Sequence, residues 1–185
     1  MAGPFDGKTV CLGVTGGIAA FKSAALASAL AQGGARVITV MTAAAAKLVT
    51  PLTFRAVTAD GAVYTSDFDD PRTPYPHITI ADQAELLVVA PCTADAMAKL
   101  AHGIADDLLS TTALAMTCPV LLAPAMNPRM WQHPATRANA ATLLSRGVRF
   151  VGPVEGRTAC GDVGLGRMAE PDAIMAEMAR ALTPR

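Results

Sequence analysis

The sequence has few of the features that mark several common classes of protein. Aromatic side chains make up only 4% of its 185 residues. Lysine plus arginine and aspartate plus glutamate number 15 each, so the net charge is zero and no basic stripe indicates nucleic-acid binding. No apolar run approaches the roughly 20 residues that span a bilayer. Residues 1–6 lack the basic and apolar regions of a secretory signal, so we expect a cytoplasmic protein without a membrane or nucleic-acid partner.

Cysteine is also sparse. The four cysteines are Cys11, Cys92, Cys118 and Cys160, and no two of them form a C-x-x-C pair. This wide spacing disfavours both a disulfide framework and a cysteine-based metal site. A reducing compartment and no bound metal are the expectations that follow.

Small apolar residues, by contrast, are abundant. Apolar residues make up 52% of the chain, and alanine is the most conspicuous of them. A length of 185 residues fits one α/β domain covering residues 1–185. Small side chains suit close packing of helices on a sheet and contacts between subunits, although an alanine-rich genome explains the same composition.

Apolar runs alternate with helical patterns along the chain. The runs that read as buried strands are Thr9–Val14, Arg36–Met41, 86–90, 120–123 and 148–151. Helical periodicity is found at 18–30, 94–101, 106–116, 135–145 and 172–182. This alternation predicts an α/β fold, in which helices cover both faces of a parallel sheet. Residues 50–76 are less regular and contain an acidic stretch at 67–71, which suits either a functional flap or surface decoration.

The predicted strand ends carry glycines, hydroxyls and an amide. They read Thr15-Gly16-Gly17, Thr42-Ala43-Ala44, 91–95 (PCTAD) and 124–127 (PAMN). Ligands of open parallel sheets bind beyond the carboxyl ends of the strands, where glycine lets the backbone approach a phosphate. The first loop is neither a G-x-G-x-x-G fingerprint nor a P-loop, and Met41-Thr42 offers no carboxylate for a ribose diol. FMN is therefore favoured over NAD, unless the glycines serve only tight packing.

Four segments together resemble a known family. They are residues 13–20 (GVTGGIAA), His77-Ile78 before the strand at 86–90, residues 124–131 (PAMNPRMW) and residues 159–168 (ACGDVGLGRM). In these segments the sequence resembles the flavin-containing cysteine decarboxylases, whose P-x-M-N-x-x-M-W motif the third segment matches. The resemblance runs from about Thr9 to Pro171.

The resemblance implies a flavodoxin-like or Rossmann-like three-layer sandwich that binds FMN. The residues it assigns to the cofactor are Gly16, Gly17, Ile18, Thr42, Ala43, Ala44, Thr93, Ala94, Asp95, Ala96 and Ala125. These positions agree with the ends of the predicted strands.

The resemblance also implies a reaction. It is the oxidative decarboxylation of 4′-phosphopantothenoylcysteine to 4′-phosphopantetheine in coenzyme A biosynthesis, with the redox step supplied by FMN. His77 would be the general base, Asn127 would bind the substrate carboxylate, and Cys160 would be the proton donor. The remaining residues assigned to the substrate are Met126, Arg157, Thr158 and Ala159.

Each of these catalytic roles has an ordinary structural alternative. A lone histidine is commonly structural or solvated, an Asn before Pro128 is a good helix cap, and the glycines after Cys160 suit plain turns. The segment from Arg157 to Arg167 also suits a mobile lid over an anionic substrate.

The family resemblance carries expectations about partners. It implies a homotrimer, or a multiple such as a dodecamer, and a separate synthetase that supplies the cysteine adduct. The W-A-D that often follows the family's histidine is replaced here by Gln83-Ala84-Glu85. The tryptophan is therefore lost, and we expect a subunit interface or a pocket wall to differ from that of the family.

Three other functions are alternatives to this reaction. A peptidyl-cysteine decarboxylase of peptide maturation shares the 124–131 motif but typically lacks the segment around Cys160. A flavin prenyltransferase lacks residues resembling 124–131. A non-catalytic flavoprotein regulator would carry a long acidic tail, which is absent from this sequence.

Overall fold

The computed structural model describes residues 3–59, 61–65 and 74–183. Its centre is a six-stranded sheet of order β3-β2-β1-β4-β5-β6, in which neighbouring strands are parallel. The strands are β1 (Thr9–Val14), β2 (Arg36–Met41), β3 (Val63–Tyr64), β4 (Leu86–Cys92), β5 (Val120–Pro124) and β6 (Arg149–Phe150). This sheet confirms the expected flavodoxin-like α/β fold.

The central strands are apolar because helices cover both of their faces. β1 lies between β2 and β4, where Leu12 pairs with Thr39 on one side and Val88 on the other. All seven residues of β4 are buried. Gly13 of β1 leaves room for Leu109, since a Cβ atom at Gly13 would lie 2.7 Å from the Leu109 Cδ1 atom.

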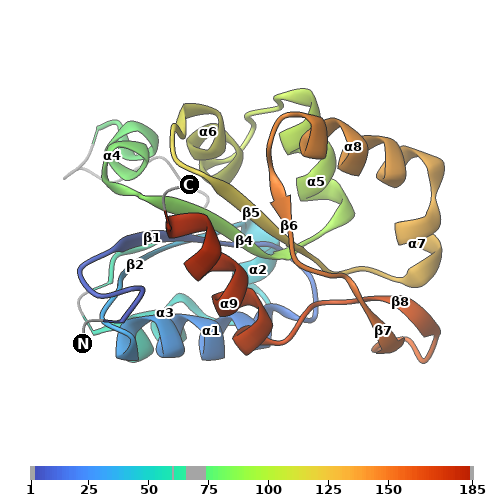
Figure 1. Cartoon of the computed structure of the whole chain (residues 1–185), viewed down its shortest axis with the longest axis horizontal. Helices are drawn as coiled ribbons and strands as arrows, with labels where there is room; N and C mark the ends of the chain where they lie inside the picture. Colours follow the sequence, from blue (N-terminus) through green and yellow to red (C-terminus); the bar gives the residue numbers. More distant parts are fainter. Residues whose placement is uncertain (1–2, 60, 66–73, 184–185) are drawn as a thin grey trace.

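Two helical layers enclose the sheet (Figure 1). One layer holds α1 (Ala20–Gln32), α3 (Pro51–Thr58) and α9 (Pro171–Leu182). The other holds α4 (Pro76–Gln83), α5 (Ala94–His102), α6 (Leu108–Ala115) and α8 (Pro134–Ser145). The result is a three-layer sandwich with an apolar core on each side of the sheet.

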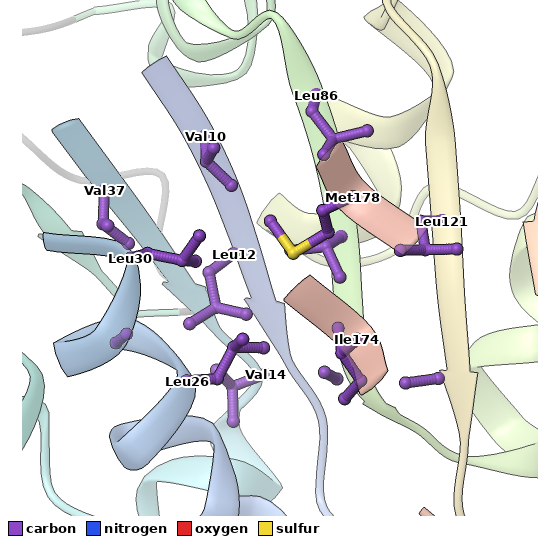
Figure 2. Close-up of a cluster of buried hydrophobic side chains, with 14 of the residues drawn as sticks. Val10, Leu12, Val14, Leu26, Leu30, Val37, Leu86, Leu121, Ile174 and Met178 are labelled. Atoms are coloured by element: carbon purple, nitrogen blue, oxygen red, sulfur yellow. The ribbon is translucent and has the colours of Figure 1, made fainter. Parts of the chain in front are cut away.

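Figure 2 shows the core on the α1 and α9 side. Leu26 and Leu30 of α1, Ile174 and Met178 of α9, and Leu12 of the sheet belong to one buried cluster. All five side chains are fully buried. Burying a side chain of this size contributes about 1.5–3 kcal/mol each, so these contacts fix α9 on the sheet beside α1.

The helices that start near the carboxyl edge of the sheet are capped by side chains. Thr42 accepts a hydrogen bond from Ala45 N in the short α2 (Ala43–Ala46), and Thr93 accepts one from Ala96 N in α5. Asp107 and Ser110 form a reciprocal capping box at the start of α6. These caps satisfy N–H groups at helix starts and hold the strand-end loops in place.

Several elements were not predicted. Helix α3 and strand β3 occupy part of the segment expected to be irregular, while the acidic residues 67–71 lie outside the described residues. Helices α4 and α7 (Pro128–Gln132) and the antiparallel hairpin of β7 (Val154–Arg157) and β8 (Val163–Arg167) were also missed. In Figure 1 this hairpin projects beside α7, beyond the sheet. Among the described residues, no helix is both long and apolar enough to cross a membrane.

Candidate active site

A cavity with a volume of about 540 Å³ lies beyond the carboxyl ends of the central strands. This volume is typical of a site for a small ligand. Its walls come from the start of α1, the β4–α5 turn, the loop before α7 and the β7–β8 hairpin. Twelve residues that the sequence assigned to cofactor or substrate line it: Gly16, Gly17, Ile18, Thr93, Ala94, Ala125, Met126, Asn127, Arg157, Thr158, Ala159 and Cys160.

The glycine loop is tied to the neighbouring strand end. The Thr15 hydroxyl donates to the Pro91 carbonyl at 2.7 Å, and Thr93 N donates back to the Thr15 hydroxyl at 3.2 Å. A Cβ atom at Gly16 would collide with Ala44 of α2. Glycine is therefore required at this position for close approach, which holds the floor of the cavity against α2.

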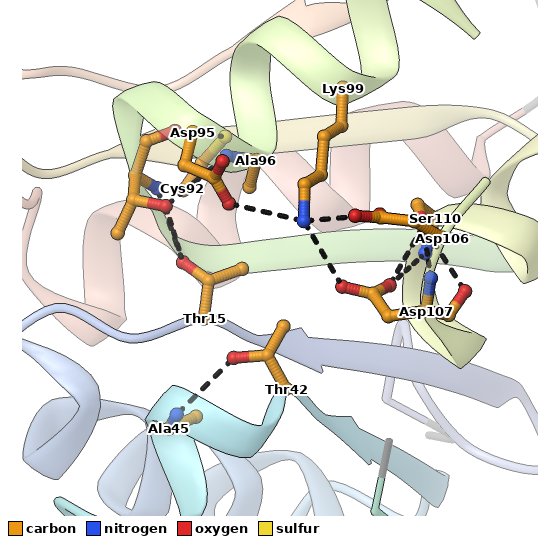
Figure 3. A network of polar contacts seen from close by, with 11 residues as sticks. Thr15, Thr42, Ala45, Cys92, Asp95, Ala96, Lys99, Asp106, Asp107 and Ser110 are labelled. Atoms are coloured by element: carbon orange, nitrogen blue, oxygen red, sulfur yellow. Dashed lines mark hydrogen bonds and ion pairs between the residues drawn. The ribbon is translucent and has the colours of Figure 1, made fainter. Parts of the chain in front are cut away.

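The other strand-end residues surround a smaller adjacent cavity. Thr42, Asp95 and Ala96 line it, together with Lys99 of α5. Figure 3 shows Lys99 reaching toward Asp95, Asp106 and Asp107, at N–O distances of 3.4, 3.1 and 3.7 Å. Partial burial disfavours the charged ammonium, but the hydrogen bond to Asp106 and the nearby carboxylates raise the pKa of Lys99. Asp95 is therefore held by a lysine in the second turn of its own helix.

Asn127 has two sets of contacts. Its Oδ1 atom accepts from Arg129 N at 2.8 Å and caps α7. Its Nδ2 atom donates to Cys160 Sγ at 3.0 Å and to Asp162 Oδ2 at 2.7 Å. One side chain thus shapes the loop with its oxygen and presents its N–H₂ group to the hairpin.

Cys160 is exposed and lies in a polar setting. Its sulfur is 3.1 Å from the Thr158 hydroxyl. Hydrogen bonds with the Thr158 hydroxyl, the Asp162 backbone and the Asn127 amide lower the pKa of the Cys160 thiol below its ordinary value. Burial instead raises the pKa of the Cys92 thiol to about 12. Cys160 is therefore better suited than Cys92 to exchange a proton.

Sequence reasoning missed Asp162, which holds the hairpin against the Asn127 loop. Its carboxylate accepts from Asn127 and pairs with Arg129 at 3.2 Å. The Asn127 amide, and then the Arg129 charge, lower the pKa of the Asp162 carboxyl. Met126 N also donates to the Gly166 carbonyl at 2.9 Å. The only sequence signal for Asp162 was its place within the matched segment 159–168.

Sequence reasoning also missed Lys22 of α1, which lines the cavity. Lys22 Nζ lies 2.7 Å from Glu170 Oε1, and Arg167 Nη2 lies 3.1 Å from the same oxygen. Arg167 lines the cavity too. The Lys22 hydrogen bond is the largest cause that lowers the pKa of the Glu170 carboxyl below its ordinary value.

The structure does not bring His77 to this cavity. His77 is half-buried in the first turn of α4 and is not among the described residues that line either cavity. Ala43 and Ala44 of α2 likewise lie outside both linings, although Ala44 packs against Gly16.

The chain is similar to known proteins over nearly its whole length. The family described as Flavoprotein matches residues 3–183. The chain is 48% identical over 171 residues to the coenzyme A biosynthesis bifunctional protein CoaBC of Bacillus subtilis (strain 168). That alignment covers 92% of this chain and 42% of CoaBC, so the chain spans less than half the length of this relative.

Solved structures with this fold include two decarboxylases. A cysteine-to-serine mutant of PPC decarboxylase, complexed with pantothenoylaminoethenethiol, matches with a TM-score of 0.83 and 31% identity. The match covers 92% of this chain and 96% of that one. The FMN-dependent cysteine decarboxylase SpaF matches with a TM-score of 0.82 and 34% identity, covering 96% and 97% of the two chains.

Proposed function

The chain belongs to the Flavoprotein family, and from that premise we propose that it binds FMN and decarboxylates 4′-phosphopantothenoylcysteine to 4′-phosphopantetheine. The observation that carries this proposal is one cavity lined by the Gly16–Gly17 loop, Asn127 and Cys160. The similar proteins named for coenzyme A biosynthesis, PPC decarboxylase and FMN-dependent cysteine decarboxylase support the same reaction.

The residues present fit FMN. Gly16 and Gly17 line the cavity without side chains, so the backbone can approach a phosphate, and they precede α1, whose start presents a positive dipole end to that phosphate. The residues that would hold the cofactor are those already named at the ends of β1, β2, β4 and β5. When bound, FMN would supply the removal and return of a hydride at the substrate's cysteine end.

The protein's own groups would orient the substrate and move protons. The Asn127 amide, which donates to Asp162 in this structure, would donate to the substrate carboxylate instead. An uncharged amide binds the carboxylate without a cation that would oppose the loss of CO₂. Cys160, beside Asn127, would give a proton to the enethiolate that remains after CO₂ leaves. Because Asp162 occupies the amide, substrate entry would shift the β7–β8 hairpin.

A direct assay tests the proposed reaction. We expect the purified protein to be yellow, to release FMN on denaturation, and to convert 4′-phosphopantothenoylcysteine into a product lighter by CO₂. Mass spectrometry measures the product, and the absorption spectrum of the released flavin identifies the cofactor. A colourless protein that cannot be reconstituted with FMN would contradict the proposal. Turnover only of a peptide ending in cysteine would favour the peptidyl-cysteine decarboxylase alternative.

A second copy of the chain would complete the site. His77 lies outside the cavity of its own chain, while Ile18 and Phe21 at the cavity are 62% and 61% exposed. Covering such apolar side chains favours association. We therefore propose a cytoplasmic homo-oligomer, a trimer or a multiple such as a dodecamer, in which His77 of one copy serves the cavity of its neighbour. We also propose that a separate synthetase supplies the substrate.

Light scattering and subunit mixing test this assembly. We expect a trimer or a multiple of one. Co-refolding inactive His77→Asn and Cys160→Ser chains should restore part of the activity, because some cavities in the mixed oligomer then receive an intact His77 from one chain and an intact Cys160 from another. Mixing wild type with an inactive variant in the same ratio calibrates the yield. A fully active monomer would refute the proposed assembly.

A further inference from the structure

One wall of the cavity is positively charged. Lys22 of α1 and Arg157 and Arg167 of the hairpin all line it. Among the described residues that line the cavity, no carboxylate is present. The Lys22 side chain is only 18% exposed, so its charge is poorly screened by solvent.

Glu170 is the counter-ion for two of these cations. It precedes α9 and pairs with Lys22 at 2.7 Å and with Arg167 at 3.1 Å, while its own side chain is 57% exposed. The three groups carry one net positive charge. This leaves the cations able to accept a second, stronger anion, since a phosphate brings a charge of about −1.5 to −2 and three acceptor oxygens at pH 7.

We propose that Lys22 and Arg167 form the subsite for the phosphate group of the substrate, and that Glu170 competes with that phosphate for the two cations. This inference rests on the proposed function. Arginine can bind phosphate oxygens through two N–H groups, while lysine acts as a point charge. Lys22 and Arg167 would therefore give the protein its preference for the phosphorylated substrate over the unphosphorylated form.

The position of Arg167 favours the substrate's phosphate over that of FMN. Arg167 lies on β8, in the same hairpin that carries Thr158 and Cys160. Arg167 pairs with Val154 at the base of the hairpin, whereas Thr158 and Cys160 lie at its tip, so a substrate lying along the hairpin would have its phosphate end near Arg167 and its cysteine end near Cys160. The residues proposed for FMN lie instead at the strand-end turns, where backbone N–H groups and the Thr42 and Thr93 hydroxyls are available.

The test compares two substrates, 4′-phosphopantothenoylcysteine and pantothenoylcysteine without the phosphate. The measured quantity is the ratio of their kcat/KM values. In Lys22→Gln and Arg167→Gln this ratio should fall roughly ten- to hundred-fold, which is the worth of one charged hydrogen bond. In Glu170→Gln it should rise several-fold, because the competing anion is gone.

The opposite signs separate this proposal from a purely structural role. If the Lys22–Glu170 pair merely tied α9 to α1, then breaking it from either side would change the ratio in the same direction. Lys8 and Glu85 provide a matched control pair, since they lie 2.6 Å apart before the amino ends of β1 and β4, at the opposite edge of the sheet. Lys8→Gln and Glu85→Gln should leave the ratio unchanged.

Each remaining result has a defined meaning. Weaker binding of FMN in Lys22→Gln, with the ratio unchanged when FMN is added to saturation, would assign Lys22 to the phosphate of FMN and overturn the inference. A wild-type protein that uses both compounds equally well would also overturn the subsite but leave the proposed function intact. A wild-type protein that decarboxylates neither compound would overturn the proposed function, and this inference with it.

Discussion

Asn127→Asp should abolish decarboxylation while FMN stays bound. The amide N–H₂ of Asn127 is the only part of the side chain that aspartate lacks, and in the structure it donates to Asp162 and Cys160. Aspartate would place a carboxylate beside both Asp162 and the substrate carboxylate. Like charges in contact cost several kcal/mol when partly desolvated. At about 4 kcal/mol, turnover would be roughly a thousand-fold slower.

The controls separate this effect from a loss of structure. Aspartate still accepts a hydrogen bond from Arg129 N and is a good helix cap, so α7 should be kept. The flavin absorption and its ratio to protein should match wild type. Asn139→Asp on α8, where the amide oxygen contacts His102, should leave turnover unchanged. Wild-type activity in Asn127→Asp would mean that Asn127 is only a helix cap.

Cys160→Ser should divide the reaction into two halves. A hydroxyl is a much weaker acid than this thiol, whose pKa is lowered by Thr158, the Asp162 backbone and Asn127. Loss of two hydrogens from the substrate and loss of CO₂ should proceed, but protonation of the enethiolate should fail. The variant should accumulate the enethiol, which is two hydrogens short of 4′-phosphopantetheine. Mass spectrometry of single-turnover mixtures measures this difference.

His77→Asn provides the contrasting result. If His77 is the base of the first half, this variant should release no CO₂ and form no enethiol.

Cys118→Ser is the matched control for Cys160→Ser, because Cys118 is half-buried and contacts Met116 away from the cavity. Normal 4′-phosphopantetheine at the normal rate from Cys160→Ser would place the proton donor elsewhere and leave the segment 159–168 as a lid.

The sequence predicted the sheet well because its strands are local apolar runs. The bounds of β1 and β2 were predicted at Thr9–Val14 and Arg36–Met41, as the structure has them. Both strands are buried on both faces, so each reads as a continuous apolar stretch. The resemblance to the family was also confirmed, since the Flavoprotein family covers residues 3–183.

The hairpin was missed because little in its sequence distinguishes it from a loop. β8 reads VGLGR, and most of the residues of β7 and β8 are exposed, so neither strand shows a clear apolar pattern. Its position depends on contacts with distant residues, such as that between Asn127 and Asp162, 35 residues apart. Periodicity cannot report such contacts. The assigned roles of His77, Asn127 and Cys160 therefore stay predictions that rest on the resemblance.

The Lys22–Glu170 pair constrains the order in which the parts of the chain can fold. Its two members are 148 residues apart, whereas β1 and β2 pair through one intervening helix. Contacts of such long separation carry a large loop-closure cost and are rewarded only after much of the chain is ordered. During synthesis from the N-terminus, β1, α1 and β2 emerge before residue 170 exists. We therefore expect the basic wall of the cavity to form late in folding, after the sheet beneath it.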